Sequence, residues 1–119
     1  MSSLPTIPIL KEDKEKYVAF DVSGDSMDDG SSRAYHNGYI VICKVCPVYM
    51  VLIIGLHIVG KEYIIVHKER ILLKRIIDLD MNNGKLILRS FNPTYRDLEV
   101  DLADVKQLLV VEYQQKRKS

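Results

Sequence analysis

Short apolar segments separated by turn residues follow one another along most of this chain, and they restrict the fold more than any other feature. Several alternate apolar and polar side chains with the period of two that a half-buried strand requires. No segment shows the periodicity of an amphipathic helix over a convincing length. The sequence therefore predicts an all-β or mostly-β domain with little helix, folded as a partly open barrel or a sandwich. The expected strands are residues 17–22, 39–43, 62–67, 71–78, 85–90, 98–102 and 105–114.

Composition and turn signals divide the chain into a short lead and one domain. A length of 119 residues suits a single hydrophobic core. Residues 1–16 are polar and contain Pro5 and Pro8, so we expect a flexible N-terminal linker there and the folded domain over residues 17–119. Within that domain, Asn-Gly at residues 83–84 predicts a tight hairpin turn. The formal net charge of +1 gives no basic surface for nucleic acid.

One long apolar run, residues 39–59, raises the question of a membrane helix. About 20 apolar residues are needed to cross a bilayer, but Lys44, Pro47 and Gly55 interrupt this run. We interpret Pro47 as a break between two buried elements, and residues 48–59 fit either a strand or a buried helical turn. The N-terminus also lacks the pattern of a signal peptide. We therefore expect a cytoplasmic protein without membrane contact.

The two cysteines, Cys43 and Cys46, form a single C-x-x-C motif. Such a motif can be a redox pair or half of a zinc site, and His57 and His67 would complete a Cys2His2 set. The histidine spacing is longer than in zinc fingers, and no second C-x-x-C supports a metal site. Cys43 also falls in a strand-like segment, where cysteine packs as a small apolar residue. We expect two reduced cysteines, with no metal and no cofactor.

The segment VSGDSMDDG contains a serine, Ser26, in a glycine-flanked turn. It is either an ordinary surface loop or the site of a nucleophile. A serine hydroxyl needs a neighbouring base to remove its proton, and histidine is the usual one. His36, His57 and His67 lie in no diagnostic motif, so we expect them to be structural or solvated.

A lysine is the alternative base, provided that burial lowers its pKa towards neutrality. Lys74 interrupts an apolar run in RILLKRIIDL. On a strand it would share one face with Leu72 and Ile76. It is therefore a candidate for a lowered pKa, although a lysine extending from a strand edge towards water would give the same pattern.

Together these features resemble a known family. SGDSM at residues 23–27, LLKRI around Lys74, LILRSFNPTY at residues 86–95 and VKQLLVVEY at residues 105–113 occur in this order. The order and spacing resemble the LexA-like self-cleaving serine peptidase domains, which are the C-terminal catalytic and dimerisation domains of LexA, lambda-type phage repressors and UmuD. The resemblance covers residues 17–113 and implies a LexA-like peptidase fold.

The resemblance also implies roles for individual residues. Ser26 would be the nucleophile of a Ser-Lys dyad, and Lys74 would be its general base and later its general acid. Backbone N–H groups around the serine would stabilise the oxyanion. Gly24 would allow the turn a conformation or a close approach that a Cβ forbids. Met27 would pack beneath the turn.

At the level of biology, the resemblance implies the catalytic and dimerisation domain of a transcriptional regulator that cleaves itself and so ends repression. The substrate would be its own N-terminal segment, and a RecA–single-strand DNA filament would activate cleavage. The domain would form a homodimer through its C-terminal strand, where residues 108–113 supply an apolar edge. DNA would be bound only by a separate N-terminal domain. The alternative is a dimerisation module that keeps the peptidase fold but does not cleave.

Several positions depart from the family pattern. Asp29 replaces a proline, and the loop from Asp28 to Asn37 is longer. Asn92 and Pro93 match the family and would shape a structural loop without a chemical role. Residues 1–25 contain neither Ala-Gly nor Cys-Gly, the usual scissile dipeptides, and the chain has no helix-turn-helix segment. We expect a fragment of a longer regulator rather than a stand-alone relative.

Overall fold

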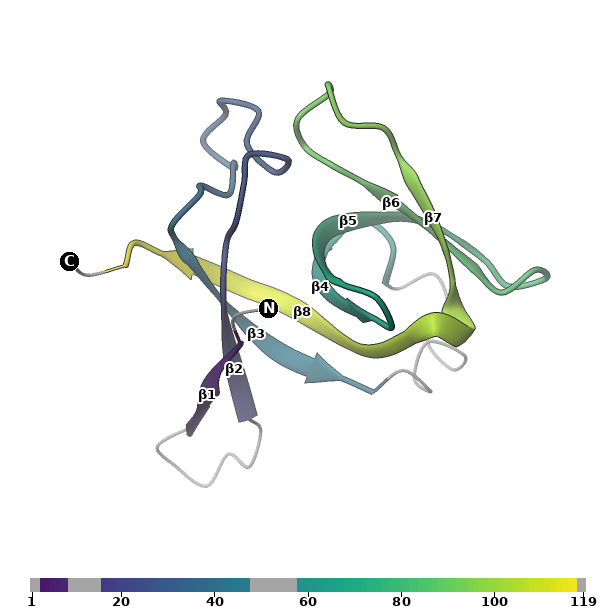
Figure 1. Ribbon diagram of the computed structural model, residues 1–119, viewed down its shortest axis with the longest axis horizontal. Helices are drawn as coiled ribbons and strands as arrows, with labels where there is room; N and C mark the ends of the chain where they lie inside the picture. Colours follow the sequence, from purple (N-terminus) through teal and green to yellow (C-terminus); the bar gives the residue numbers. More distant parts are fainter. Residues whose placement is uncertain (1–2, 9–15, 48–57, 118–119) are drawn as a thin grey trace.

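The computed structural model describes residues 3–8, 16–47 and 58–117 (Figure 1). They form one antiparallel sheet of eight strands in the order β1-β2-β3-β8-β4-β5-β6-β7. A short 3₁₀ turn at Leu102–Asp104 separates β7 from β8. The prediction of a mostly-β domain with little helix is confirmed. The strands are β1 (Ser3–Pro8), β2 (Lys16–Asp21), β3 (Ile40–Cys46), β4 (Glu62–His67), β5 (Ile71–Asp80), β6 (Lys85–Arg89), β7 (Leu98–Asp101) and β8 (Val105–Gln115).

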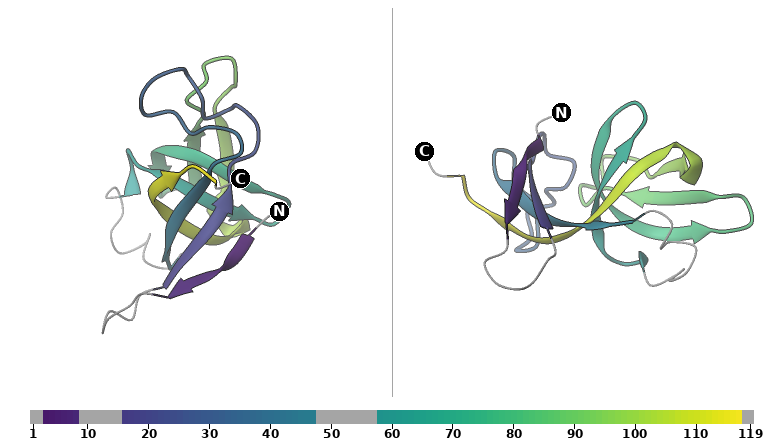
Figure 2. Two further views of the ribbon diagram at one scale, coloured as in Figure 1. Left: turned by 90° about the vertical axis from the view of Figure 1, so that its left-hand side faces the viewer. Right: turned by 90° about the horizontal axis from the view of Figure 1, so that it is seen from below.

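The sheet is open and strongly curved. β1 and β7 are its two edges, so it does not close into a complete barrel. The long strand β8 crosses the molecule and joins the half formed by β1–β3 to the curled half formed by β4–β7 (Figures 1 and 2). Residues 108–115 of β8 pair with β3, and residues 105–110 pair with β4. β8 therefore holds the two halves in one sheet.

The N-terminal segment differs from the expected linker. Residues 3–8 form β1, which pairs antiparallel with β2 and places Thr6 opposite Val18. Proline is tolerated on an edge strand, because the missing N–H can face away from the neighbouring strand. We expected a flexible linker over residues 1–16, but residues 3–8 are part of the sheet.

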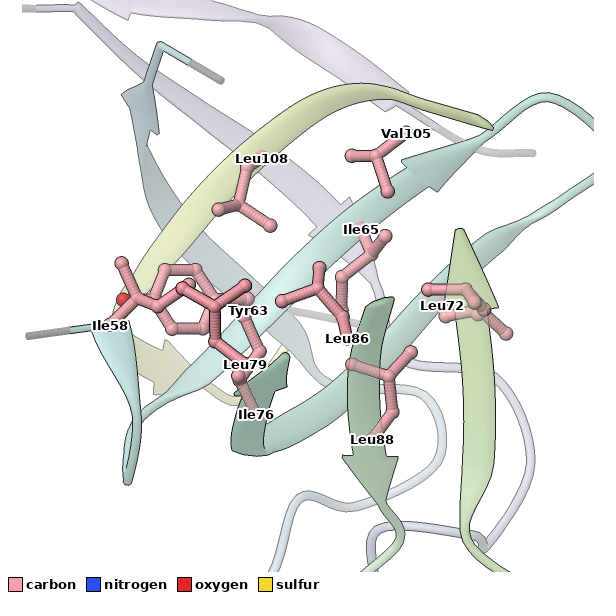
Figure 3. Close-up of a cluster of buried hydrophobic side chains, with 11 residues drawn as sticks. Ile58, Tyr63, Ile65, Leu72, Ile76, Leu79, Leu86, Leu88, Val105 and Leu108 are labelled. Carbon is pink, nitrogen blue, oxygen red and sulfur yellow. The ribbon is translucent and has the colours of Figure 1, made fainter. Parts of the chain in front are cut away.

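Two clusters of buried side chains stabilise the sheet. The larger fills the curl of β4–β8, where alternate residues of facing strands meet (Figure 3). The smaller lies mainly between β2, β3 and β8. The larger cluster is Ile58, Tyr63, Ile65, Leu72, Ile76, Leu79, Leu86, Leu88, Val100, Val105 and Leu108, and the smaller is Phe20, Val22, Val41, Cys43, Ile64 and Leu109.

The cysteines are unpaired, as expected. Cys43 is completely buried, and burial raises the pKa of its thiol to about 12, so it remains protonated and unreactive. His57, a ligand of the alternative zinc site, lies outside the described residues. Residues 3–8, 16–47 and 58–117 contain no cluster of three or more His, Cys, Asp or Glu side chains that could hold a metal ion. In the same described residues, no helix is long and apolar enough to cross a membrane.

Candidate active site

Ser26 lies in the turn of residues 24–28 that follows β2, here called the serine turn. Gly24 opens this turn with a φ of +82°, a left-handed conformation that strains any residue with a Cβ. A Cβ at Gly24 would meet no atom within 4 Å, so the requirement for glycine comes from the backbone conformation and not from close approach. Met27, expected to pack beneath the turn, is buried, with 2% of it exposed.

Lys74 lies in the middle of β5, and its side chain is almost completely buried. Leu72, Lys74 and Ile76 are the buried positions of this part of the strand, whereas Leu73 and Arg75 are only partly buried. This alternation confirms the prediction that Lys74 shares a face with Leu72 and Ile76. Only 7% of Lys74 is exposed, so its amino group is largely removed from bulk water.

The fold brings Ser26 and Lys74 together across 48 residues of sequence. Lys74 Nζ donates a hydrogen bond to Ser26 Oγ at 3.0 Å. The same nitrogen donates to Ser90 Oγ at 2.8 Å. A hydroxyl within hydrogen-bond reach of an amine has the geometry of a nucleophile with its base.

The surroundings of Lys74 favour its neutral form. Burial lowers the pKa of Lys74, and the positive charge of Arg70 lowers it further. Arg70 lies in the turn between β4 and β5 and forms no ion pair among the described residues. A lysine whose pKa is lowered exposes a lone pair at a lower pH than an ordinary lysine, and it can then accept the proton of Ser26.

Ser90 belongs to this cluster, although no role was expected for it within the segment LILRSFNPTY. It follows β6, where Leu86 and Leu88 are buried at alternate positions. Ser90 continues that alternation and is 5% exposed. The sequence signal for a role of Ser90 was its place at the next inward position after Leu86 and Leu88. A buried hydroxyl requires a hydrogen-bond partner, so a serine at such a position indicates a polar contact.

Replacing Ser90 with alanine tests its contribution. A hydrogen bond to a charged group contributes about 1.5 kcal/mol, which corresponds to about tenfold in rate if Lys74 becomes misplaced. We expect Ser26 to react about tenfold more slowly with a fluorophosphonate probe, measured by mass spectrometry. The pH midpoint of the reaction should also fall, because Ser90 accepts a hydrogen bond from the charged amine. Ser32→Ala, at an exposed serine, is the control. An unchanged rate in Ser90→Ala would exclude this role.

The loop after β6 contacts the serine turn directly. The Asn92 N–H donates to the Ser26 carbonyl at 2.9 Å. Asn92 Nδ2 donates to the Asp25 carbonyl at 3.3 Å. Asn92 therefore does more than shape its own loop, because it fixes the backbone on which Ser26 is carried.

A groove of about 760 Å³ lies beside the dyad. Ser26 and Lys74 line it together with apolar side chains that include Val22, Ile64 and Leu72. These three belong to the two buried clusters, so the groove lies where the clusters meet. It offers a bound chain a mixed surface next to the candidate nucleophile, apolar at these three residues and charged at Lys68, Glu69 and Arg70.

Neither described histidine hydrogen-bonds to Ser26. His36 Nδ1 lies 3.3 Å from Asp28 Oδ2. His67 Nδ1 accepts a hydrogen bond from the Glu69 N–H at 3.2 Å. Lysine is thus the base that the described part of the chain places at the serine.

The longer loop beside the site is held by its own hydrogen bonds. Asp29, which stands where the family has proline, accepts hydrogen bonds from both the N–H and the hydroxyl of Ser31. The Tyr35 N–H donates to the Met27 carbonyl at 2.8 Å. Asn37 Oδ1 accepts a hydrogen bond from the Gly24 N–H at 2.8 Å. The end of the loop that leads into β3 is therefore bonded back to the serine turn.

Comparison with known proteins agrees with this arrangement. The family model described as Peptidase S24-like matches residues 2–111, which is most of the chain. No curated protein and no solved structure matches significantly. The match includes the serine turn, β5 with Lys74, and the Asn92 loop. The chain belongs to the Peptidase S24-like family.

Proposed function

We propose that this domain is a serine endopeptidase that cleaves a segment of its own polypeptide with a Ser26–Lys74 dyad. The observation that carries the proposal is the 3.0 Å contact between Lys74 Nζ and Ser26 Oγ, made by a buried lysine whose pKa is lowered. The biological setting would be a LexA-like transcriptional regulator that is inactivated by its own cleavage. Membership of the peptidase family supports the reaction class.

The chemistry proceeds in two steps. Neutral Lys74 accepts the proton of the Ser26 hydroxyl while Oγ attacks the carbonyl carbon of the scissile peptide bond. The protonated amine then donates this proton to the departing nitrogen, and an ester to Ser26 remains. In the second step water attacks the ester, Lys74 accepts the proton of that water, and Ser26 Oγ recovers a proton as the acid is released.

The backbone of the serine turn supports the charged intermediate. Within the described residues, the N–H groups of Ser26 and Met27 donate to no protein acceptor. Free N–H groups beside a nucleophile are suited to stabilise the oxyanion of a tetrahedral intermediate. The Ser26 carbonyl and the Met27 N–H belong to the same peptide plane. The hydrogen bond from the Asn92 N–H to this carbonyl therefore fixes the orientation of the Met27 N–H.

One edge of β5 is suited to bind the substrate. β5 pairs with β6 only from Arg75 onward, whereas residues 71–74 pair with β4 on the other edge. Among the described strands, the second edge of residues 71–74 has no partner, and these residues line the groove. An extended substrate could pair there as an added strand, which would bring its backbone to Lys74.

Only part of the apolar segment at residues 108–113 is available for the proposed dimer contact. Residues 108–110 of β8 lie between β3 and β4, whereas residues 111–115 pair with β3 alone among the described strands. We propose that residues 111–115 pair with a second copy.

The biological setting completes the proposal: activation by a RecA–DNA filament, DNA binding through a separate domain and a cytoplasmic location. The unpaired cysteines favour a reducing compartment.

The pH dependence of cleavage tests the proposed function. Only neutral Lys74 can accept a proton, so the cleavage rate should rise with pH through the lowered pKa of Lys74 and level off below pH 10.5, the ordinary value. The full-length protein is incubated between pH 6 and 10, fragments are quantified on gels, and circular dichroism verifies folding. Absence of fragments in the folded protein at every pH would favour the non-cleaving module instead.

A further inference from the structure

We infer that Tyr95 is a positioning residue of this site: its hydroxyl anchors the serine turn through Asp25, and its ring covers Lys74. The inference rests on the proposed function for its catalytic meaning, but the anchor itself is a structural claim that can be tested separately. Tyr95 lies outside the dyad, and its role follows from three sets of contacts.

The first is the compact turn that presents Tyr95. Asn92 Oδ1 accepts hydrogen bonds from the N–H of Thr94 at 3.0 Å and from its hydroxyl at 2.7 Å. The Tyr95 N–H donates to the Asn92 carbonyl at 3.1 Å. An asparagine that bonds to the backbone two residues later stabilises a turn locally. Tyr95 is thus held by a turn that has hydrogen bonds of its own.

The second is the contact between this turn and the residue before the nucleophile. The Tyr95 hydroxyl donates to Asp25 Oδ1 at 2.6 Å. With the two bonds from Asn92, three hydrogen bonds connect this loop to the consecutive residues Asp25 and Ser26. Hydrogen bonding to Asp25 raises the pKa of the Tyr95 phenol, so the phenol remains a donor at the alkaline pH where Lys74 is neutral.

The third is the position of the ring. Lys74 Nζ lies 5.8 Å from the centre of the Tyr95 ring. Tyr95 is 45% exposed, so core packing does not account for its position. The groups that face Lys74 are the hydroxyls of Ser26 and Ser90, the ring of Tyr95 and the charge of Arg70. Of these, Tyr95 is the exposed ring, and its place over the amine leads us to infer that it shields that side of the amine from water.

Two substitutions separate the hydroxyl from the ring. Tyr95→Phe removes the bond to Asp25 and keeps the cover, so Ser26 should react with a fluorophosphonate probe about tenfold more slowly with an unchanged pH midpoint. Tyr95→Ala also admits water to Lys74 and removes the aromatic face, which favours the charged amine. We expect the gain in hydration to dominate, because burial is the main cause of the lowered pKa, so the midpoint should rise towards that of an ordinary lysine. A purely structural residue would change the rate without this difference between the two midpoints.

Amide hydrogen exchange gives a readout that does not depend on activity. The N–H groups of Asn92 and Asp28 donate to the carbonyls of Ser26 and Asp25. Both amides should exchange faster in Tyr95→Phe than in the wild type, because the serine turn opens more often. Tyr17→Phe is the control, since the Tyr17 hydroxyl forms no hydrogen bond among the described residues and lies at the far end of β2.

The outcomes distinguish the two proposals. Faster exchange and slower labelling in Tyr95→Phe, with both unchanged in Tyr17→Phe, would support the inference. Wild-type exchange and labelling in Tyr95→Phe would overturn it. Equal midpoints in Tyr95→Phe and Tyr95→Ala would overturn the role of the ring. If the wild type is never labelled at Ser26 but exchange still increases in Tyr95→Phe, the anchor stands and the peptidase proposal fails.

Discussion

Replacing Ser26 with alanine should abolish self-cleavage of the full-length protein, with a loss of at least about a thousandfold in rate. In the proposed mechanism the Ser26 hydroxyl attacks the peptide bond, and no other described group bonded to Lys74 Nζ borders the groove. The substitution removes one partly buried hydroxyl and no buried apolar group, so the free energy of unfolding should change by less than about 1 kcal/mol. Fragments on gels measure the first effect, and urea unfolding measures the second.

Ser32→Ala is a matched control for this experiment. Ser32 lies in the same loop region and is exposed, and no hydrogen bond involves its side chain among the described residues. It should cleave at the wild-type rate. Persistent cleavage by Ser26→Ala would mean that another nucleophile acts or that a contaminating protease is present, and fluorophosphonate labelling at residue 26 in the wild type would then decide between them.

Replacing Lys74 with arginine should cause a comparable loss, at least about a thousandfold, because arginine keeps the charge and the donors but cannot lose its proton. The rise of the cleavage rate with pH should disappear together with the activity. Lys74→Met, which removes the charge and keeps an unbranched side chain, should be equally inactive. Gel assays between pH 6 and 10 compare all three proteins.

Lys61→Arg is the control for this substitution. Lys61 is exposed just before β4, and its backbone carbonyl accepts the Ile76 N–H while its side chain forms no ion pair among the described residues. The control should keep both its rate and its pH dependence. If Lys74→Arg cleaved at a wild-type rate, Lys74 would act as a positive charge rather than as a base.

Much of the fold was accessible from local sequence patterns. The segment ILLKRIID predicts a strand with Lys74 on the same face as Leu72, and β5 confirms it, because side chains alternate strictly along any strand. Gly84, in the predicted hairpin turn, has a φ of +64°, as an Asn-Gly turn requires. These predictions held because each depends on the residues of a single segment.

Other features could not be predicted locally. β1 was missed because its two prolines indicate a linker, and only pairing with β2 identifies it as an edge strand. Ser90 and Tyr95 were missed for a related reason. Ser90 bonds to Lys74, and Tyr95 bonds to Asp25, the residue before Ser26. Both contacts form only after β5, β6 and the following loop have been brought together.

The sequence by itself determined the strands β2–β8, the inward face of Lys74 and, through resemblance, the pairing of a serine turn with a lysine. Alternation, turn chemistry and motif order are properties of neighbouring residues, so they can be read without a structure. Only the tertiary structure decided that Lys74 Nζ reaches both Ser26 and Ser90, and that Tyr95 bonds to Asp25 beside them. Those contacts depend on how distant strands curve and pair around β8, and this depends on the packing of the whole core.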